Sequence, residues 1–255
     1  MAKIGIVIPT IFERPEYLFE AIKSIRSAGD AHILLSAPDS DLKEPYLELV
    51  DEFRAELPEG NLAAKINHAL GQLPSDCEFI GWLGDDDLLT PKSLERASAA
   101  FENNQQLRLV YGSCDYIDSQ GNKIGHNPSG EWAKKLLHFG PFLIPQPGSL
   151  WKREAFQAIG GIDDQFAMAF DHDLFLRLER QSGAMFIDNT QAAFRWHPNS
   201  LSVGRRWQSV TEASKVRKSH YSKYLLPVML IWEPLVVLAT KFAGDFVSWR
   251  TIKKS

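Results

Sequence analysis

The sequence predicts an α/β fold, in which a mixed β-sheet is flanked by helices and followed by a helical tail. The β-branched run from Ile4 to Ile8 is typical of a parallel strand that is buried on both faces. From there to residue 117, short apolar runs alternate with segments whose apolar residues repeat at helical spacing, as in βαβ units. The turn Asp118–Asn122 then predicts a hairpin, so the sheet is expected to contain antiparallel strands as well.

Each remaining element follows from its own local signals. Pro15 begins the first helix, whose apolar residues Leu18, Ile22 and Ile25 share one face, and Gly29 ends it. Further helices are expected at 44–53, 62–70 (with Asn61 as the cap), 91–101, 132–139, 153–159 and 171–181. The further strands are expected at 32–35, 79–83, 107–117 and 184–187.

Length and composition limit the classes of protein that fit. The 255 residues suffice for one substantial core, and 44% hydrophobic with 24% charged residues is ordinary for a globular protein. The net charge of −4 argues against general binding of nucleic acid. Two cysteines without metal-type spacing suit a reducing compartment, and the apolar part of the N-terminus is too short for a signal peptide. The chain is therefore expected in the cytoplasm.

Three consecutive carboxylates, Asp85, Asp86 and Asp87, follow the apolar run that ends at Leu83. Clustered acids at the end of a buried strand repel one another, and a hard divalent cation with oxygen ligands relieves that repulsion. The alternative is a solvated acidic turn in which Thr90 caps the next helix and Pro91 occupies its first position. These residues alone leave both interpretations open.

Polar residues also follow the first two predicted strands. Ligands of such sheets bind at the carboxyl ends of the strands, so Thr10, Glu13 and the loop that contains Asp39 are candidates for a site. The turn after the first strand has no glycine-rich phosphate loop, which argues against a dinucleotide-binding or P-loop protein.

Two segments differ in composition from the rest. Residues 125–147 are rich in proline and aromatic residues, which fits an acceptor-binding loop or lid, or else a surface crossover. Residues 208–255 form a basic and apolar tail appended to the α/β domain of residues 1–207. Prolines and charges interrupt the apolar run, so we expect an interfacial helix on a membrane surface, or a tail that packs on its own core or forms a homodimer, rather than a span.

Several separate stretches together resemble the family 2 glycosyltransferases, which have the GT-A nucleotide-sugar-binding fold with a Rossmann-like mixed sheet. The stretches are Ile6–Thr10 with Arg14–Leu18, Asn61–Leu70, Gly84–Asp87, Gly148–Phe156, Gly160–Asp163 and Asp171–Leu178. The resemblance covers residues 3 to about 203 and rests on the order and spacing of the motifs. It implies an inverting enzyme that uses a nucleotide sugar, with a UDP-sugar as the first expectation.

The resemblance also implies roles for individual residues. Asp86 occupies the position of the metal ligand, with Asp85 and Asp87 assisting and His197 completing the site, and the expected cation is Mn²⁺ or Mg²⁺. Residues on the nucleotide side are Pro9, Thr10, Lys65 and Asn67, and the alternative for Lys65 is a position on a solvated helix face. The family's acid on the second strand is replaced here by Leu35–Ser40, with Asp39 as a shifted substitute, which leaves the base open.

Asp171 matches the general base that takes the proton of the acceptor hydroxyl in this family. The alternative is that Asp171 only caps its helix, and Asp173 is expected to pair with Arg177 one turn later. The expected acceptor is a glycan or a lipid-linked glycan of a surface polysaccharide. Two rival functions are a noncatalytic relative that binds nucleotide sugar or glycan, and a sugar nucleotidyltransferase.

Overall fold

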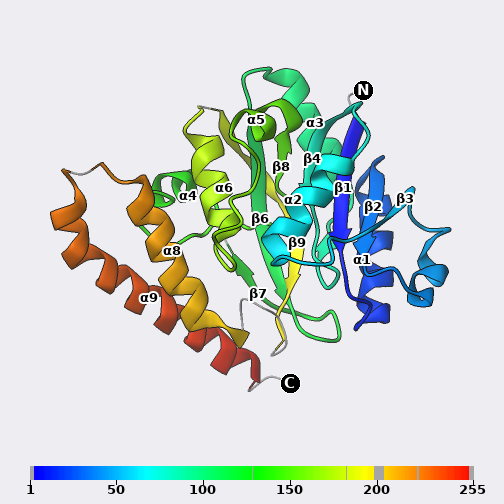
Figure 1. The fold of residues 1–255 in the computed structure, drawn as a ribbon. Helices are drawn as coiled ribbons and strands as arrows, with labels where there is room; N and C mark the ends of the chain where they lie inside the picture. Colours follow the sequence, from blue (N-terminus) through cyan, green and yellow to red (C-terminus); the bar gives the residue numbers. More distant parts are fainter. Residues whose placement is uncertain (1–2, 128, 182, 198–203, 223, 253–255) are drawn as a thin grey trace.

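The computed structural model describes residues 3–252, apart from residues 128, 182, 198–203 and 223. Its described residues form a nine-stranded mixed sheet with helices on both faces (Figure 1). The strand order is β3-β2-β1-β4-β8-β6-β9-β5, and β7 pairs with β6 as a hairpin. The predicted fold class, a mixed α/β sheet flanked by helices with a helical tail, is therefore confirmed.

The strands are β1 (Lys3–Pro9), β2 (His32–Ala37), β3 (Glu52–Ala55), β4 (Cys77–Trp82), β5 (Leu88–Leu89), β6 (Leu109–Ile117), β7 (Lys123–Asn127), β8 (Leu150–Lys152) and β9 (Ala184–Arg195). The helices are α1 (Pro15–Ala28), the 3₁₀ helix η1 (Asp41–Tyr46), α2 (Leu62–Gln72), α3 (Ser93–Asn103), α4 (Glu131–Leu136), α5 (Arg153–Ala158), α6 (Phe170–Glu179), α8 (Arg206–His220) and α9 (Leu226–Ile252).

Strand β1 lies near the middle of the sheet and pairs in parallel with β2 and β4. Because successive side chains of a strand point to opposite faces, Ile6 and Ile8 enter one core and Val7 enters the other. The first core is closed by α1 and α3, and the second by α2, α5 and α6. The uninterrupted apolar sequence of β1 is thus explained by helices on both faces.

Three expectations about local structure are wrong. Helix α3 begins at Ser93 with Lys92 at its cap position, so Thr90 and Pro91 do not provide its cap and first residue, and the Thr90 hydroxyl donates to the Thr190 carbonyl instead. The helix expected at 44–53 is absent: a short 3₁₀ helix ends at Tyr46, and Phe53 lies in β3, which pairs in parallel with β2. Pro45 lacks an amide proton and does not support a longer helix. The strand expected at 184–187 continues to Arg195, because β9 pairs along the whole of β6. Periodicity within one segment does not report such long-range pairing.

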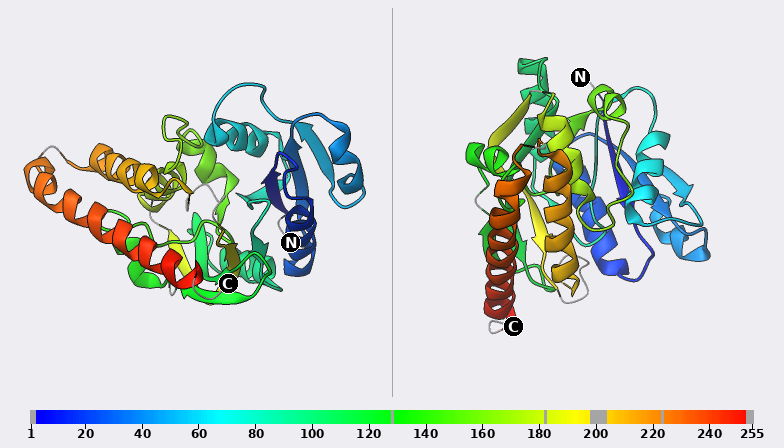
Figure 2. Two further views of the ribbon diagram at one scale, coloured as in Figure 1. Left: turned by 90° about the horizontal axis from the view of Figure 1, so that it is seen from below. Right: turned by 60° about the vertical axis from the view of Figure 1, so that its left-hand side comes forward.

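The C-terminal helices lie side by side at one flank of the sheet (Figure 2). Helix α8 packs against α6, and α9 packs against the outer side of α8. Among the described residues, one helical segment, Pro227–Asp245, has the length and composition of a membrane-crossing helix, and 22% of its most apolar window is buried. Cys77 and Cys114 are buried free thiols.

Candidate functional site

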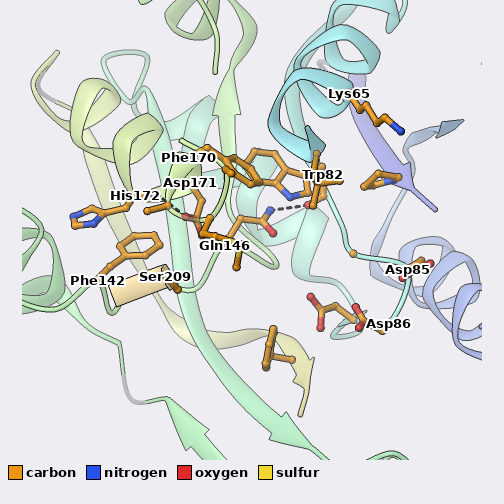
Figure 3. Close-up of a pocket in the computed structure, with 18 of the residues that line it drawn as sticks. Lys65, Trp82, Asp85, Asp86, Phe142, Gln146, Phe170, Asp171, His172 and Ser209 are labelled. Atoms are coloured by element: carbon orange, nitrogen blue, oxygen red, sulfur yellow. Dashed lines mark hydrogen bonds between the residues drawn. The ribbon is translucent and has the colours of Figure 1, made fainter. Parts of the chain in front are cut away.

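A cavity of about 720 Å³ opens at the carboxyl ends of β1 and β4. The turn between β1 and α1 and the acid loop 84–87 line one end, and the start of α6 lines the other. Figure 3 shows Asp85 and Asp86 at one end and Asp171 with His172 toward the other, separated by Trp82 and Gln146. This is the position at which sheets of this kind bind ligands.

The acid loop faces the turn after β1. The Thr10 hydroxyl donates a hydrogen bond of 2.6 Å to Asp85 Oδ2. The Arg14 guanidinium lies 2.7 Å from Asp86 Oδ2 and 3.6 Å from Asp85 Oδ1. His197 Nε2 is 2.8 Å from the same Oδ2 of Asp86. Two carboxylates, one guanidinium and one imidazole therefore converge on a single point.

The third acid has a different environment. The carboxylate of Asp87 is buried, and its Oδ1 accepts a hydrogen bond of 3.0 Å from the backbone amide of Arg195. Burial, followed by the neighbouring charge of Asp86, raises the pKa of Asp87 well above its usual value. A glycine at position 84 allows the Asp86 and Asp87 side chains to lie close to the backbone of the loop, because a Cβ there would lie 3.0 Å from Asp86 Oδ1 and 3.2 Å from Asp87 Oδ2.

Arg195 is 1% exposed, and its side chain contacts the backbone of the acid loop. Its Nε donates to the carbonyl oxygen of Asp86 at 2.9 Å, and its NH2 pairs with Glu20 at 2.5 Å. The guanidinium also lies over the ring of Tyr17, 4.2 Å from the ring centroid. These contacts give Arg195 the role of fixing the backbone beside Asp86.

At the other end of the cavity, Asp171 lies in the first turn of α6. Burial raises the pKa of Asp171 to about 6. The backbone amide of His172 donates a hydrogen bond of 2.8 Å to Oδ1, which by itself lowers this pKa. The charge of Glu212 on α8 adds to the upward shift. A carboxylate with a pKa near the working pH is suited to exchanging a proton with a bound hydroxyl.

Aromatic side chains form the wall between the two ends. Trp82 packs on Phe170 with ring centroids 5.7 Å apart, and Gln146 Nε2 donates to the Trp82 carbonyl at 2.8 Å. Phe142 stacks on His172 at 4.8 Å, and burial lowers the pKa of His172 to about 4. The imidazole of His172 is thus neutral at pH 7 and belongs to an apolar wall.

The structure brings together most of the predicted site residues. The cavity is lined by Pro9, Thr10, Glu13, Lys65, Asp85, Asp86, Asp87 and Asp171. Lys65 forms an ion pair with Glu56, in which Nζ lies 2.5 Å from Oε1. His197 reaches the site through its contact with Asp86.

Two of the predicted nucleotide-binding residues do not line the cavity. Asp39 is exposed and pairs with Lys43. The Oδ1 of Asn67 accepts a hydrogen bond of 3.0 Å from the Ile162 amide, and a Cβ on Gly161 would lie only 2.5 Å from the same oxygen. The expected ion pair between Asp173 and Arg177 is confirmed, with Nε 2.7 Å from Oδ2.

Sequence reasoning did not identify Arg14, Gln146 or the contribution of α8. Arg14 shares the turn of Glu13 and directly precedes the helix-starting Pro15, which was a usable signal for a residue of the site. Ser209, Val210 and Ala213 of α8 also line the cavity, and α8 begins where the tail was expected to separate from the domain. No local pattern in the sequence indicates that the tail folds back onto the cavity.

The acid loop offers few protein donors to a divalent cation. Within the described part of the chain, no group of three or more His, Cys, Asp or Glu side chains is arranged to hold a metal ion. Asp86 and His197 nevertheless present an oxygen and a nitrogen donor beside the cavity. Two protein donors suit Mg²⁺ or Mn²⁺, because such cations take their remaining ligands from phosphate oxygens and water.

No protein-family model matches the chain. It is similar to the O-antigen biosynthesis protein RfbC of Myxococcus xanthus, with 29% identity over 171 residues that span 66% of this chain and 13% of RfbC. The chondroitin synthase of Escherichia coli is 23% identical over 69% of this chain and 26% of the synthase. An uncharacterized glycosyltransferase of Methanocaldococcus jannaschii is 23% identical over 68% of this chain and 63% of its own length. The chain thus spans less than two thirds of each of these relatives.

Solved structures of S. aureus TarS share the fold at 12% identity. The structure of residues 1–349 in complex with UDP-GlcNAc has a TM-score of 0.62 and matches 84% of this chain and 66% of that one. The complex with UDP has a TM-score of 0.58 and matches 99% of this chain and 90% of that one. The likeness in sequence to an O-antigen biosynthesis protein, a chondroitin synthase and a glycosyltransferase supports a glycosyltransferase, and the solved structures show the same fold.

Proposed function

We propose that the chain is an inverting, cation-dependent glycosyltransferase that moves a sugar from a nucleoside diphosphate, with UDP-sugars as the first candidates, to an acceptor hydroxyl. The observation that carries this proposal is the placement of the Asp85–Asp86 pair and the carboxylate of Asp171 along one cavity. The S. aureus neighbour in complex with UDP-GlcNAc supports a nucleotide-sugar donor, and the relatives support a place in polysaccharide synthesis. The cytoplasm remains the proposed location, in accord with the two free thiols.

The two ends of the cavity then have separate tasks. Asp86 and His197 would hold Mg²⁺ or Mn²⁺, and Asp85 would assist from its hydrogen bond with Thr10. The bound cation supplies a Lewis acid that stabilises the negative charge of the departing diphosphate. Asp87 holds the acid loop in shape through the Arg195 amide.

Asp171 provides the base for the acceptor. The hydroxyl proton moves to a carboxylate oxygen as the acceptor oxygen attacks the anomeric carbon from the side opposite the diphosphate. That geometry inverts the configuration at the anomeric carbon. Trp82 and Phe170 form an apolar wall of the cavity beside Asp171.

The test is a screen of nucleotide sugars for binding, hydrolysis and transfer, with Mn²⁺, with Mg²⁺ and with EDTA. We expect one donor class to bind, and its turnover to require a cation. The variant Asp86→Ala is compared with Asp188→Ala, which removes an exposed acid outside the cavity lining. If Asp86→Ala binds and turns over every donor as the unsubstituted chain does, the proposed cation site is wrong. Tight donor binding without turnover under any condition would favour the noncatalytic alternative.

A further inference from the structure

Helix α9 presents a long apolar face that no other described element covers. The side chains of Val228, Ile231, Leu235, Leu238 and Phe242 recur at helical spacing and are exposed, with 75% of Ile231 and 57% of Leu235 accessible. Over these fifteen residues the stripe is about 20 Å long at the α-helical rise. A contiguous exposed surface of this kind marks a contact with another molecule or with lipid.

The single ionisable residue between Leu225 and Thr240 is turned away from this face. It is Glu233, whose carboxylate is fully buried and bonded to Arg217 of α8 at 2.6 and 2.9 Å. The Tyr221 hydroxyl donates a third hydrogen bond, of 2.9 Å, to the same carboxylate. The outward face of this part of α9 is therefore free of charged side chains.

The same contacts determine how α9 can meet a membrane. Met229 and Val236 are buried on the inner side of the helix, and Arg206 of α8 pairs with Asp245 near its far end at 2.7 Å. Separation of α9 from α8 would leave the buried charge of Glu233 without its partner, which is strongly unfavourable. Helix α9 can therefore lie along a bilayer surface with its outward side in the interface, but it does not cross the bilayer while α8 is attached.

Charge distribution indicates which kind of surface is met. Residues 208–255 carry 8 Lys and Arg against 3 Asp and Glu, a net charge of +5, whereas residues 1–207 carry 20 against 29, a net charge of −9. The basic segment that carries this apolar face is complementary in charge to an anionic lipid surface, whereas the acidic remainder of the chain is repelled by such a surface. Of these basic residues, Lys223, Lys253 and Lys254 lie outside the described residues.

The apolar face continues toward the cavity. Trp232 of α9 donates its indole N–H to the Phe139 carbonyl, and the half-exposed Phe139 ring stacks on Tyr221 at 5.9 Å. Pro141 and Phe142, a few residues further along the chain, line the cavity, as does Thr240 of α9. The proposed lipid contact is therefore connected through residues 139–142 to the end of the cavity that holds Asp171, where Phe142 lies beside His172 (Figure 3).

We propose that the outward face of α9, extended by Phe139, docks onto an anionic membrane surface, and that the acceptor is an amphiphile. Its hydrocarbon part stays in the bilayer while its polar head, which carries the accepting hydroxyl, enters the cavity beside Asp171. The part of this proposal that concerns the acceptor rests on the proposed function. Docking of α9 to lipid stands independently of it.

The experiment is sedimentation of the full chain with vesicles of phosphatidylcholine alone and of phosphatidylcholine with phosphatidylglycerol. We expect binding to the anionic vesicles, and Ile231→Glu to lower the partition coefficient by about tenfold or more, because one buried aliphatic side chain is lost to the interface. The matched control is Leu42→Glu, which places one new acid at an aliphatic residue that is 61% exposed near the β3 edge of the sheet. The control is expected to bind as the unsubstituted chain does.

Equal binding by the Ile231→Glu and Leu42→Glu variants, or equal binding to both kinds of vesicle, would overturn the docking proposal. A dimer that Ile231→Glu dissociates, with no vesicle binding by either form, would show that a second copy covers the face and would also overturn it. Titration of UDP-GlcNAc and other donors into the same samples separates the two proposals. If the unsubstituted chain binds anionic vesicles but no donor, only the proposed function is contradicted. If it binds a donor but not the vesicles, only the lipid contact is contradicted.

Discussion

Replacement of Asp171 by Asn removes the candidate base with little change in shape. The amide oxygen of Asn can accept the same hydrogen bond from the His172 amide, which is 2.8 Å long in the structure. A lost general base costs a factor of about 10² or more in turnover. We therefore expect transfer to fall by at least that factor while donor binding, which involves the other end of the cavity, is retained.

The same substitution is expected to stabilise the fold. Burial raises the pKa of Asp171 from 3.8 to about 6, so the folded state holds the proton more tightly than the unfolded state. The free energy of unfolding of the unsubstituted chain therefore falls as the pH rises between these two values. A shift of this size corresponds to about 3 kcal/mol at pH 7.5, of which about half develops between pH 5 and pH 7.5.

The assay is urea unfolding of both chains at pH 5 and pH 7.5, with turnover measured on the same preparations. The variant should be more stable than the parent, and its advantage should grow with pH. The parent's transfer rate should also fall about tenfold per pH unit below pH 6, as the base becomes protonated. An Asn variant that keeps full turnover removes Asp171 from the role of base. An advantage in stability that does not depend on pH refutes the assignment of a raised pKa.

Three further predictions concern the cation, the tail and the second core. Asp86→Asn should abolish the response of donor binding to Mn²⁺, measured by calorimetric titration with and without EDTA, and an unchanged response would contradict its role as a ligand. Arg217→Met should lower the free energy of unfolding, measured in urea, by about 3–5 kcal/mol, because it leaves the buried Glu233 carboxylate without a partner. The double variant Arg217→Met with Glu233→Leu should regain most of that loss. Equal destabilisation of the two variants would contradict a buried, paired Glu233. Asn67→Ala should lower the free energy of unfolding by about 1–3 kcal/mol, because it leaves the Ile162 amide without its acceptor, and the affinity for the sugar donor should be unchanged. Weakened donor binding with unchanged stability would show instead that Asn67 binds the nucleotide.

Local signals accounted for much of the fold. The apolar run of β1, the proline that begins α1 and the cap provided by Asn61 each act over a few residues, and the structure shows all three elements. The Asn61 side chain accepts from the Ala64 amide at 3.0 Å, as the cap interpretation requires. Where pairing across the sheet decides the outcome, as in β3 and in the second half of β9, the local patterns predicted the wrong element or the wrong length.

The amino-acid sequence by itself determined the chemistry of the candidate site. The three acids after Leu83 and the acid that begins α6 are set by residue type and by their place at the ends of elements. Their division of labour was decided by the tertiary structure. Only the fold pairs Asp86 with Arg14 and His197, gives one oxygen of Asp87 to the Arg195 amide, and buries Asp171 enough to raise its pKa.

In the tail, too, the sequence determined the kinds of contact that are available and the tertiary structure decided which are made. Its sequence showed basic residues around an apolar run, which left a membrane surface, a second subunit and its own core as open contacts. Tertiary packing placed Glu233 against Arg217 and brought α8 to the cavity. The physical reason is that charge and hydropathy along the chain determine which kinds of surroundings are favourable for a segment. Burial and pairing, in contrast, depend on residues that are distant in sequence and become adjacent only after folding.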